Sequence, residues 1–186
     1  MSFQPLSQTV TSGKTQEIPS SDAVYNAIAT GVGTAFPYYG SFYDTTIQNN
    51  LVADAVNIMS YNTTAENYHV TIQNNNRITF EYPGVYNIQF SAQLEKTGGQ
   101  ASVVNIWLRK NGNDVAWSDT EITLANASRQ VASWNFVISE VANDYIQICW
   151  ASSDTNVRVF SQAATINPPR PAIPSVILTV TPVKAP

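Results

Sequence analysis

Two β-strands joined at a Pro-Gly corner constrain the fold of this chain more than any other feature. They span Arg77 to Phe90, and β-branched and aromatic residues dominate on both sides of Pro83-Gly84. Proline fixes φ and glycine can adopt a positive φ, so the pair predicts a sharp turn between the strands. From Tyr86 to Leu94, apolar residues recur at every second position. This alternation predicts an antiparallel strand with one buried face.

Short strands separated by turn residues are predicted along the rest of the chain, with almost no helical periodicity after Gly40. This pattern favours a sandwich or a barrel over an α/β fold. The proline-rich segment Asn167–Pro174 is predicted to be an extended loop, because four prolines remove four hydrogen-bond donors. The predicted strands are Gly40–Thr46, Ala55–Tyr61, Tyr68–Gln73, Ile78–Tyr82, Val85–Glu95, Ser102–Lys110, Val115–Leu124, Val131–Ser139, Tyr145–Ala151, Val157–Gln162 and Ser175–Val183.

The alternation also assigns faces to the strands. The predicted core consists of Ile106, Leu108, Trp134, Phe136, Ile138, Ile146, Ile148, Trp150, Val176, Leu178 and Val180. The opposite faces carry further apolar residues, namely Val103, Trp107, Val131, Val137, Tyr145 and Val159. A monomer rarely exposes a large contiguous apolar patch, so burial between subunits is predicted for this second set.

Three segments carry a family resemblance. The first contains Phe80, Pro83-Gly84, Tyr86 and Phe90, the second is Trp107–Gly112, and the third is Asn143–Ile148. In order and spacing they resemble the jelly-roll superfamily of the complement globular head and tumour necrosis factor. The resemblance covers Phe42 to Val183, and it implies an antiparallel jelly-roll β-sandwich of about ten strands that assembles as a trimer without enzymatic activity.

The domain organisation is predicted as an N-terminal attachment arm over residues 1–37 and a sandwich over residues 38–186. The arm is polar, with isolated apolar residues at Phe3, Pro5, Leu6 and Val10. A segment of this composition cannot bury a core of its own. It is either a disordered tail or an arm whose apolar residues seat in pockets of a partner.

A short helix is predicted within the arm, over about residues 21–30. Ser20 or Ser21 can cap it and Gly31 can end it. Val24 and Ile28 share one face, which either meets its copies around a trimer axis or packs on the chain's own sandwich. Tyr38, Tyr39, Phe42 and Tyr43 are the other candidate trimer contacts. The segment from Thr11 through Ala27 also resembles a segment that precedes globular tips in tailed-phage fibre proteins.

Composition limits the chemistry. Only 12% of the residues are charged and the net charge is −4, which argues against nucleic acid and anionic membranes as partners. We expect no cofactor, no metal and no enzyme activity, because His69 is the only histidine and Cys149 the only cysteine. A surface calcium site at Asp114, Asp119, Asp144 or Asp154, or a carboxylate pair among Glu95, Glu121 and Glu140, stays open.

These observations predict a non-catalytic trimeric protein on the virion surface of a tailed phage, made in the host cytoplasm because no secretory signal is apparent. The first expectation is a capsid decoration or cement protein that docks on capsid proteins through its arm. The alternative is the receptor-binding tip of a tail fibre, whose loops Asn74–Asn76, Asn111–Asp114 and Ser152–Asn156 contact a host sugar or protein. A polysaccharide depolymerase is a more distant alternative.

Overall fold

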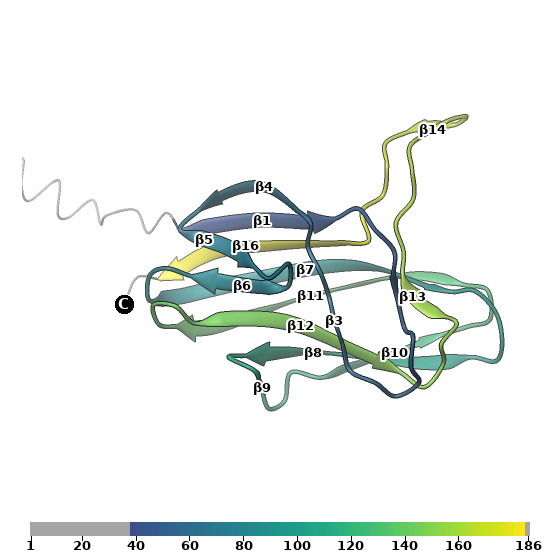
Figure 1. The fold of residues 1–186 in the computed structure, drawn as a ribbon, viewed down its shortest axis with the longest axis horizontal. Helices are drawn as coiled ribbons and strands as arrows, with labels where there is room; N and C mark the ends of the chain where they lie inside the picture. The colour runs from purple at the N-terminus through teal and green to yellow at the C-terminus, as the bar shows by residue number, and fades with distance from the viewer. Residues whose placement is uncertain (1–37, 185–186) are drawn as a thin grey trace, which may run out of the picture. The chain divides into compact units, whose positions relative to one another are not determined.

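The computed structural model describes residues 38–184. Within this range the protein is all-β, and two antiparallel sheets pack against each other as a sandwich (Figure 1). The predicted helix and the candidate residues Phe3, Pro5, Leu6, Val10, Val24 and Ile28 lie outside the described range, so they stay predictions. In the range 38–184 no helix has the length and hydropathy to span a membrane.

The first sheet has the strand order β4-β1-β16-β7-β11. Strand β7 pairs with β11 along almost its whole length, so β16 and the short β13 share its other edge. The bounds are β1 Tyr39–Asp44, β2 Gln48–Asn49, β4 Thr63–Tyr68, β7 Gly84–Lys96, β11 Arg129–Glu140, β13 Val157–Val159 and β16 Val176–Lys184.

The second sheet has the strand order β10-β8-β12-β6-β5, and two short strands pair at its borders. The bounds are β3 Asn57–Ile58, β5 Val70–Gln73, β6 Arg77–Phe80, β8 Ser102–Lys110, β9 Asn113–Asp114, β10 Thr120–Leu124 and β12 Tyr145–Ser152. A separate hairpin of β14 (Thr165–Ile166) and β15 (Pro169–Arg170) projects from the sandwich (Figure 1).

The chain passes repeatedly from one sheet to the other. It runs from β6 in the second sheet to β7 in the first, then to β8 in the second, and it repeats this exchange through β10, β11, β12 and β16. An antiparallel double sheet wound in this way is a jelly roll. The predicted jelly-roll sandwich is therefore confirmed.

The Pro83-Gly84 corner is one of the connections between the sheets. It joins β6 to β7, and the hydroxyl of the buried Tyr86 donates a 2.9 Å hydrogen bond to the carbonyl of Tyr82 across it. Gly84 does not take the positive φ expected from the sequence. It is instead the first residue of β7 and pairs with Glu140, so the turn is made before the glycine.

The predicted strands agree with the structure best where they are long. Ser102–Lys110 has the predicted bounds, and β7, β11, β12 and β16 differ from prediction by a few residues at most. Strand β4 was not predicted. Residues 115–119, predicted as strand, form a loop before β10, and the proline-rich loop contains the β14–β15 hairpin.

Most of the predicted core is buried, including Trp150, whose side chain is 1% exposed. Three of its members are only half-buried: Trp134, Phe136 and Ile138. Their side chains do face the core side of the sheet. Because β11 is the edge strand, neighbouring side chains in the sheet cover them only on the side of β7. Val159, predicted to lie on an outer face, is fully buried.

Candidate subunit interface and polar sites

The outer face of the first sheet is uncharged along the middle of four neighbouring strands, and the charged pair Glu95 and Arg129 lies at one end of it. Its side chains form rows across β1, β16, β7 and β11, because the strand registers place them opposite one another. We call this set the uncharged face: Ser41, Tyr43, Asn87, Gln89, Ser91, Gln93, Val131, Ser133, Asn135, Val137, Ser139, Ile177, Thr179 and Thr181. Depletion of charged residues is typical of the centre of a protein–protein interface.

Strand β11 is an unprotected edge. In the described range it pairs only with β7, which leaves one row of its backbone N–H and C=O groups open along a twelve-residue strand. Neither a charge nor a proline interrupts the strand from Gln130 to Ser139. Val131 and Val137 are 58% and 60% exposed. Monomeric proteins usually protect such an edge with charge, proline or a bulge, so this edge is a candidate contact surface.

A half-buried indole with a buried N–H group adds to the case for β11 as a contact surface. Trp134 packs edge-on against Phe90 with ring centroids 4.7 Å apart. Its Nε1 is buried and has no hydrogen-bond partner within the described part of the chain. An unsatisfied buried donor costs about 1–3 kcal/mol, and an acceptor from another chain or segment would remove this cost.

The outer face of the second sheet is different. It carries the charged residues Arg77, Arg109 and Glu121. Arg109 Nε donates a 2.7 Å hydrogen bond to Oδ1 of Asp114, an exposed carboxylate at the end of β9. The asymmetry between the two faces makes the uncharged face the better candidate for contact between subunits.

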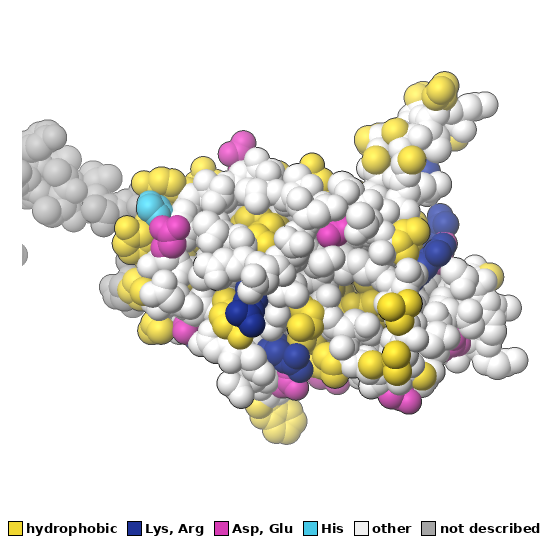
Figure 2. All heavy atoms as spheres, viewed as in Figure 1, with side chains coloured by type: hydrophobic (Ala, Val, Ile, Leu, Met, Phe, Trp, Pro, Cys, Tyr) yellow, Lys and Arg dark blue, Asp and Glu magenta, His cyan; other side chains and the backbone are white. Residues whose placement is uncertain are grey.

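A cleft lies at the base of the β14–β15 hairpin and borders the uncharged face. It has a volume of about 800 Å³, and Tyr43 and Ile177 of the uncharged face contribute to its lining together with Ile173. Hydrophobic side chains gather along the hairpin (Figure 2), and Ile166 is 94% exposed. The apolar surface on this side therefore extends beyond the sheet.

The structure describes four of the residues predicted as trimer contacts. Tyr43 lies on the uncharged face, and Tyr39 is 40% exposed at the start of β1. Tyr38 stacks on Tyr82 with ring centroids 4.5 Å apart. Phe42 is a correction, because it points into the sandwich and is fully buried in the protomer's own core.

His69 is at the junction of β4 and β5, where its φ is 57°. Its ring makes edge contacts with Tyr38, Tyr68 and Tyr82, and Nδ1 lies 2.7 Å from Oε2 of Glu81. The sequence suggested an ordinary strand position for this histidine. The observed contacts hold the ring in an aromatic cluster at the sheet border.

The carboxylates considered for glycoside hydrolysis do not all converge. Glu95 pairs with Arg129 at one end of the β7–β11 ladder, and Glu140 is at the other end of β11. At a rise of about 3.3 Å per residue, the two positions are roughly 36 Å apart. Glycosidase carboxylates lie within about 10 Å of each other, so Glu95 and Glu140 do not form such a pair.

Glu95 is part of an ion cluster. Arg129 and Arg158 each donate hydrogen bonds to its carboxylate. Burial alone would raise the pKa of Glu95, but the two guanidinium groups outweigh it and hold the pKa below its usual value. The group therefore acts as a structural anion between β11 and β13.

Glu140 is a buried carboxylate that shares one lysine with Asp144. Lys110 Nζ lies 3.0 Å from Oε2 of Glu140 and 2.8 Å from Oδ2 of Asp144. Neither oxygen of Glu140 accepts a hydrogen bond of good geometry from a described residue. Burial raises the pKa of Glu140 to about 7, and Lys110 offsets only part of this effect. Burial acts on Asp144 too, but hydrogen bonds from Lys110, the Val141 amide and Asn111 hold its pKa well below the usual range.

Glu140→Gln should therefore change how stability depends on pH. Because the folded-state pKa of Glu140 is raised, the protonated group stabilises the fold below about pH 4.5, and this contribution is lost as pH rises through about 7. Asp144 stays ionised over this interval. We expect the free energy of unfolding of the wild type to fall by about 1–3 kcal/mol between pH 4.5 and 8, and that of Glu140→Gln to fall less. Urea titrations of both proteins at the two pH values measure this, and parallel pH profiles would contradict it.

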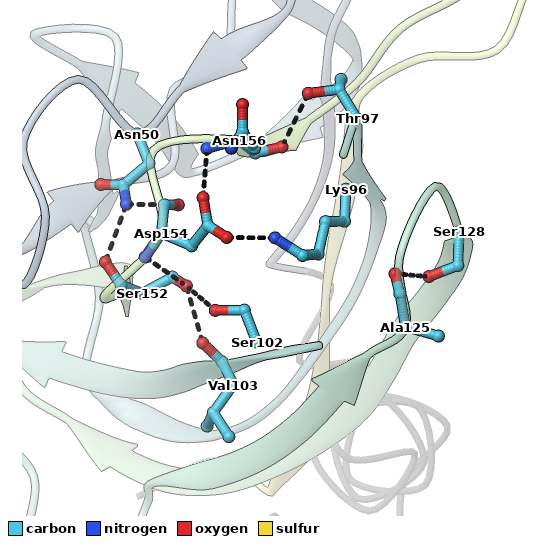
Figure 3. A network of polar contacts seen from close by, with 10 residues as sticks. All are labelled: Asn50, Lys96, Thr97, Ser102, Val103, Ala125, Ser128, Ser152, Asp154 and Asn156. Carbon is cyan, nitrogen blue, oxygen red and sulfur yellow. Dashed lines mark hydrogen bonds and ion pairs between the residues drawn. The ribbon is translucent and has the colours of Figure 1, made fainter. Parts of the chain in front are cut away.

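A second buried ion pair lies within a polar network around the β12–β13 turn (Figure 3). Lys96 on β7 has a fully buried side chain, and its ammonium pairs with the carboxylate of Asp154. Asn50 Nδ2 donates hydrogen bonds to the carbonyls of Ser152 and Asp154, at 2.8 and 3.1 Å. Oδ1 of Asp154 accepts a 2.8 Å bond from the Asn156 amide. The network fixes the turn and compensates the lysine charge.

Asp154→Asn should leave the Lys96 ammonium buried without a charged partner. Asp154 is partly exposed, so water can reach the site, and we expect a loss of about 1–3 kcal/mol in the free energy of unfolding. The double variant Lys96→Met/Asp154→Asn is the control, because it removes the buried charge as well and should regain most of the loss. Chemical denaturation of the three proteins measures this. Equal stability of wild type and Asp154→Asn would show that the pair is not formed.

No cluster of three or more His, Cys, Asp or Glu side chains that could hold a metal occurs in residues 38–184. Each aspartate considered for calcium contacts a cation or an amide: Asp114 contacts Arg109, Asp119 contacts Asn105, Asp144 contacts Lys110 and Asp154 contacts Lys96. Cys149 is buried, and burial raises the pKa of its thiol to about 11, which suits a core residue better than a nucleophile.

No family model and no curated protein matches the sequence. The solved structures that match include two with 9% identity and a TM-score of 0.49 each. One is the globular domain of zebrafish complement 1qA, with 80% of this chain and 99% of that domain covered, and the other is murine APRIL, with 78% and 98% covered.

The likeness is one of fold. The strand order described above is that of a jelly roll, the fold that the resemblance of the three sequence segments implies. The strand order of the structure therefore confirms the predicted fold.

The sequence prediction missed one conspicuous surface residue. Trp117 was placed in a strand, but it is completely exposed in the loop between β9 and β10. The order Ala116-Trp117-Ser118-Asp119 holds a signal, since polar residues follow the tryptophan where a strand would continue its alternation. Trp107 and Trp117 line a small pocket together with Asp114, the last residue of the predicted contact loop Asn111–Asp114.

Proposed function

We propose that the protein is a non-enzymatic homotrimer in which the uncharged face of one subunit covers the β11 edge of the next. The observation that carries this proposal is the absence of charge from the described residues of that face, beside an open and apolar edge strand. The covering surface is the part of the uncharged face on β1, β16 and β7, and the covered surface is the β11 edge, so they are different surfaces of one chain. A contact between them is head-to-tail, and such contacts close into a ring when the rotation permits. A ring of three is the assembly that the sequence resemblance implies.

The trimer would cover the apolar side chains and the open backbone groups that β11 exposes in one chain. A neighbour on the edge would cover Val131 and Val137 and exclude water from Trp134. It would also present polar atoms to the free backbone groups of β11. The polar residues of the uncharged face can supply such atoms, since Asn135 and Asn87 already share a 2.8 Å hydrogen bond there.

We further propose that the trimer is a surface protein of a tailed-phage virion, synthesised in the host cytoplasm, and that it decorates the capsid. This proposal rests on the resemblance of residues 11–27 to phage fibre segments and on the apolar residues of the arm. Three arms on one trimer bind together, so weak individual contacts with capsid proteins give a long-lived attachment. A stable sandwich on the shell needs no cofactor.

The alternative is a receptor-binding protein at the tip of a tail fibre. One observation favours it specifically, the exposed Trp117 beside the Asn111–Asp114 loop, because a decoration protein needs no such residue. Both alternatives use the same trimer and differ in where the arm attaches.

Imaging of intact particles separates the two functions. A C-terminal tag labelled with gold should decorate the heads if the protein is cement, and particles without it should release their DNA more easily on heating. Label confined to the tail, with lost adsorption, would establish the alternative. As a test of the arm, removal of residues 1–18 should keep the trimer and abolish particle binding, whereas unchanged binding would reject the arm.

A further inference from the structure

The loop between β9 and β10 holds a tryptophan in solvent. Trp117 is 103% exposed, and its φ of 64° lies in the left-handed region, which is rare for a bulky residue. A hydrophobic projection is visible at this loop in Figure 2. Exposure of an indole and a left-handed backbone are both unfavourable, so the position is not explained by the folding of the protomer.

The loop is anchored on both sides of this residue. Ser118 is buried, and its hydroxyl accepts a 3.0 Å hydrogen bond from the Leu108 amide and donates a 2.7 Å bond to the Val115 carbonyl. The Val115 amide in turn donates a 2.9 Å bond to the Leu108 carbonyl. The loop is therefore fastened to β8, and the indole is presented from a fixed base. A rigid base lowers the entropy that binding would cost.

A small pocket lies beside the exposed indole. It has a volume of about 270 Å³ and is lined by Trp107, Asp114, Val115, Trp117 and Asp119. Pockets that enclose drug-sized ligands measure roughly 300–1,000 Å³. The pocket is thus large enough for a single six-membered ring of a ligand, and two indoles and two carboxylates border it.

The carboxylates are oriented and still have acceptor capacity. Oδ1 of Asp114 accepts hydrogen bonds from Trp107 Nε1 and Arg109 Nε, both at 2.7 Å. Oδ2 of Asp119 accepts a 3.1 Å bond from Asn105 Nδ2. The second oxygen of each carboxylate accepts no hydrogen bond from a described residue. Each can accept from a hydroxyl group of a ligand, and hydrogen bonds to charged acceptors are stronger than neutral ones.

We propose that this pocket binds an uncharged hexose unit of a glycan. A pyranose ring has an apolar C–H face that can lie on the Trp117 indole, and its ring of hydroxyl groups can donate to Asp114 and Asp119. Burial of the C–H face against the indole removes apolar surface from water. The two carboxylates disfavour sialic or uronic acids through like-charge repulsion.

The site goes beyond the proposed assembly and does not depend on where the particle carries the protein. Its residues belong to β8, β9 and the loop before β10, which are part of the second sheet and not of the uncharged face. A trimer would carry three copies of the pocket, so weak binding of single sugars would become strong binding to a surface that displays many.

The test uses the full chain and albumin conjugates that display many copies of glucose, galactose, mannose, N-acetylglucosamine or N-acetylgalactosamine. Biolayer interferometry should detect at least one of these conjugates. Trp117→Ala should weaken that binding at least tenfold, and Trp117→Phe should weaken it less because an aromatic face remains. Asp119→Asn should reduce it as well.

Ile166→Ala is the matched control, because it removes an equally exposed apolar side chain elsewhere and should leave binding unchanged. A conjugate of sialyllactose should bind more weakly than its neutral counterpart. Three results would overturn the proposal: no binding of any neutral conjugate, binding that Trp117→Ala does not affect, or binding of a choline conjugate alone, which would indicate a cation site.

Discussion

Val137→Arg should convert the trimer into monomers. Val137 lies on the edge strand β11, at the border of the uncharged face, and is 60% exposed in the protomer, so an arginine can be accommodated when the chain is alone. In the proposed trimer the same side chain is covered by a neighbour. A buried charge without a partner costs several kcal/mol, and in a ring this cost arises once at each subunit interface. Sedimentation should show one chain in place of three, with an unchanged far-ultraviolet circular dichroism spectrum.

The matched control is Val52→Arg. Val52 is 62% exposed, almost as much as Val137, but it is in the loop between β2 and β3 and not on the uncharged face. This variant should remain trimeric. Dissociation by both variants would indicate a general effect of added charge, and a trimeric Val137→Arg would place the interface elsewhere.

Trp150→Ala should cause the largest loss of stability in a single protomer. Trp150 is on the central strand β12, is 1% exposed and is the largest fully buried side chain described. Truncating a buried tryptophan costs about 3–5 kcal/mol, from lost burial and from the cavity left behind. The measurement is urea unfolding in the Val137→Arg background, since the unfolding of a trimer depends on protein concentration.

Trp134→Ala in the same background distinguishes core from edge. The indole of Trp134 is half-buried, so its loss should cost only about 1–2 kcal/mol in the monomer. In the otherwise wild-type trimer it should also weaken association. If Trp134→Ala cost the monomer as much as Trp150→Ala, then β11 would not be an open edge.

The sequence predicted the long strands well, because alternation of side chains reports directly which face is buried. It did not predict β4, because Thr63–Tyr68 is mostly exposed and owes its place to backbone pairing with β1. The sequence predicted a strand at Val115–Asp119, where the structure has a loop, because Val115 and Trp117 alternate with small residues. There the hydrogen bonds of Ser118 to Leu108, ten residues earlier on β8, decide the conformation, and side-chain alternation does not report them.

The candidate interface was predictable in part. Val131 and Val137 were correctly placed on an outer face, but Trp134, Phe136 and Ile138 were assigned to a closed core. Alternation shows which way a side chain points but not whether its strand has neighbours on both sides. That information comes from pairing between distant segments, here β11 with β7, and only the structure contains it.

The most direct test of the proposed assembly is the mass of the full-length protein in solution by sedimentation equilibrium, at micromolar concentration and moderate ionic strength. The account predicts a single species with three times the mass of the 20.3 kDa chain. A monomer or a dimer under these conditions would contradict it, because the uncharged face and the β11 edge would then have no partner of the proposed kind.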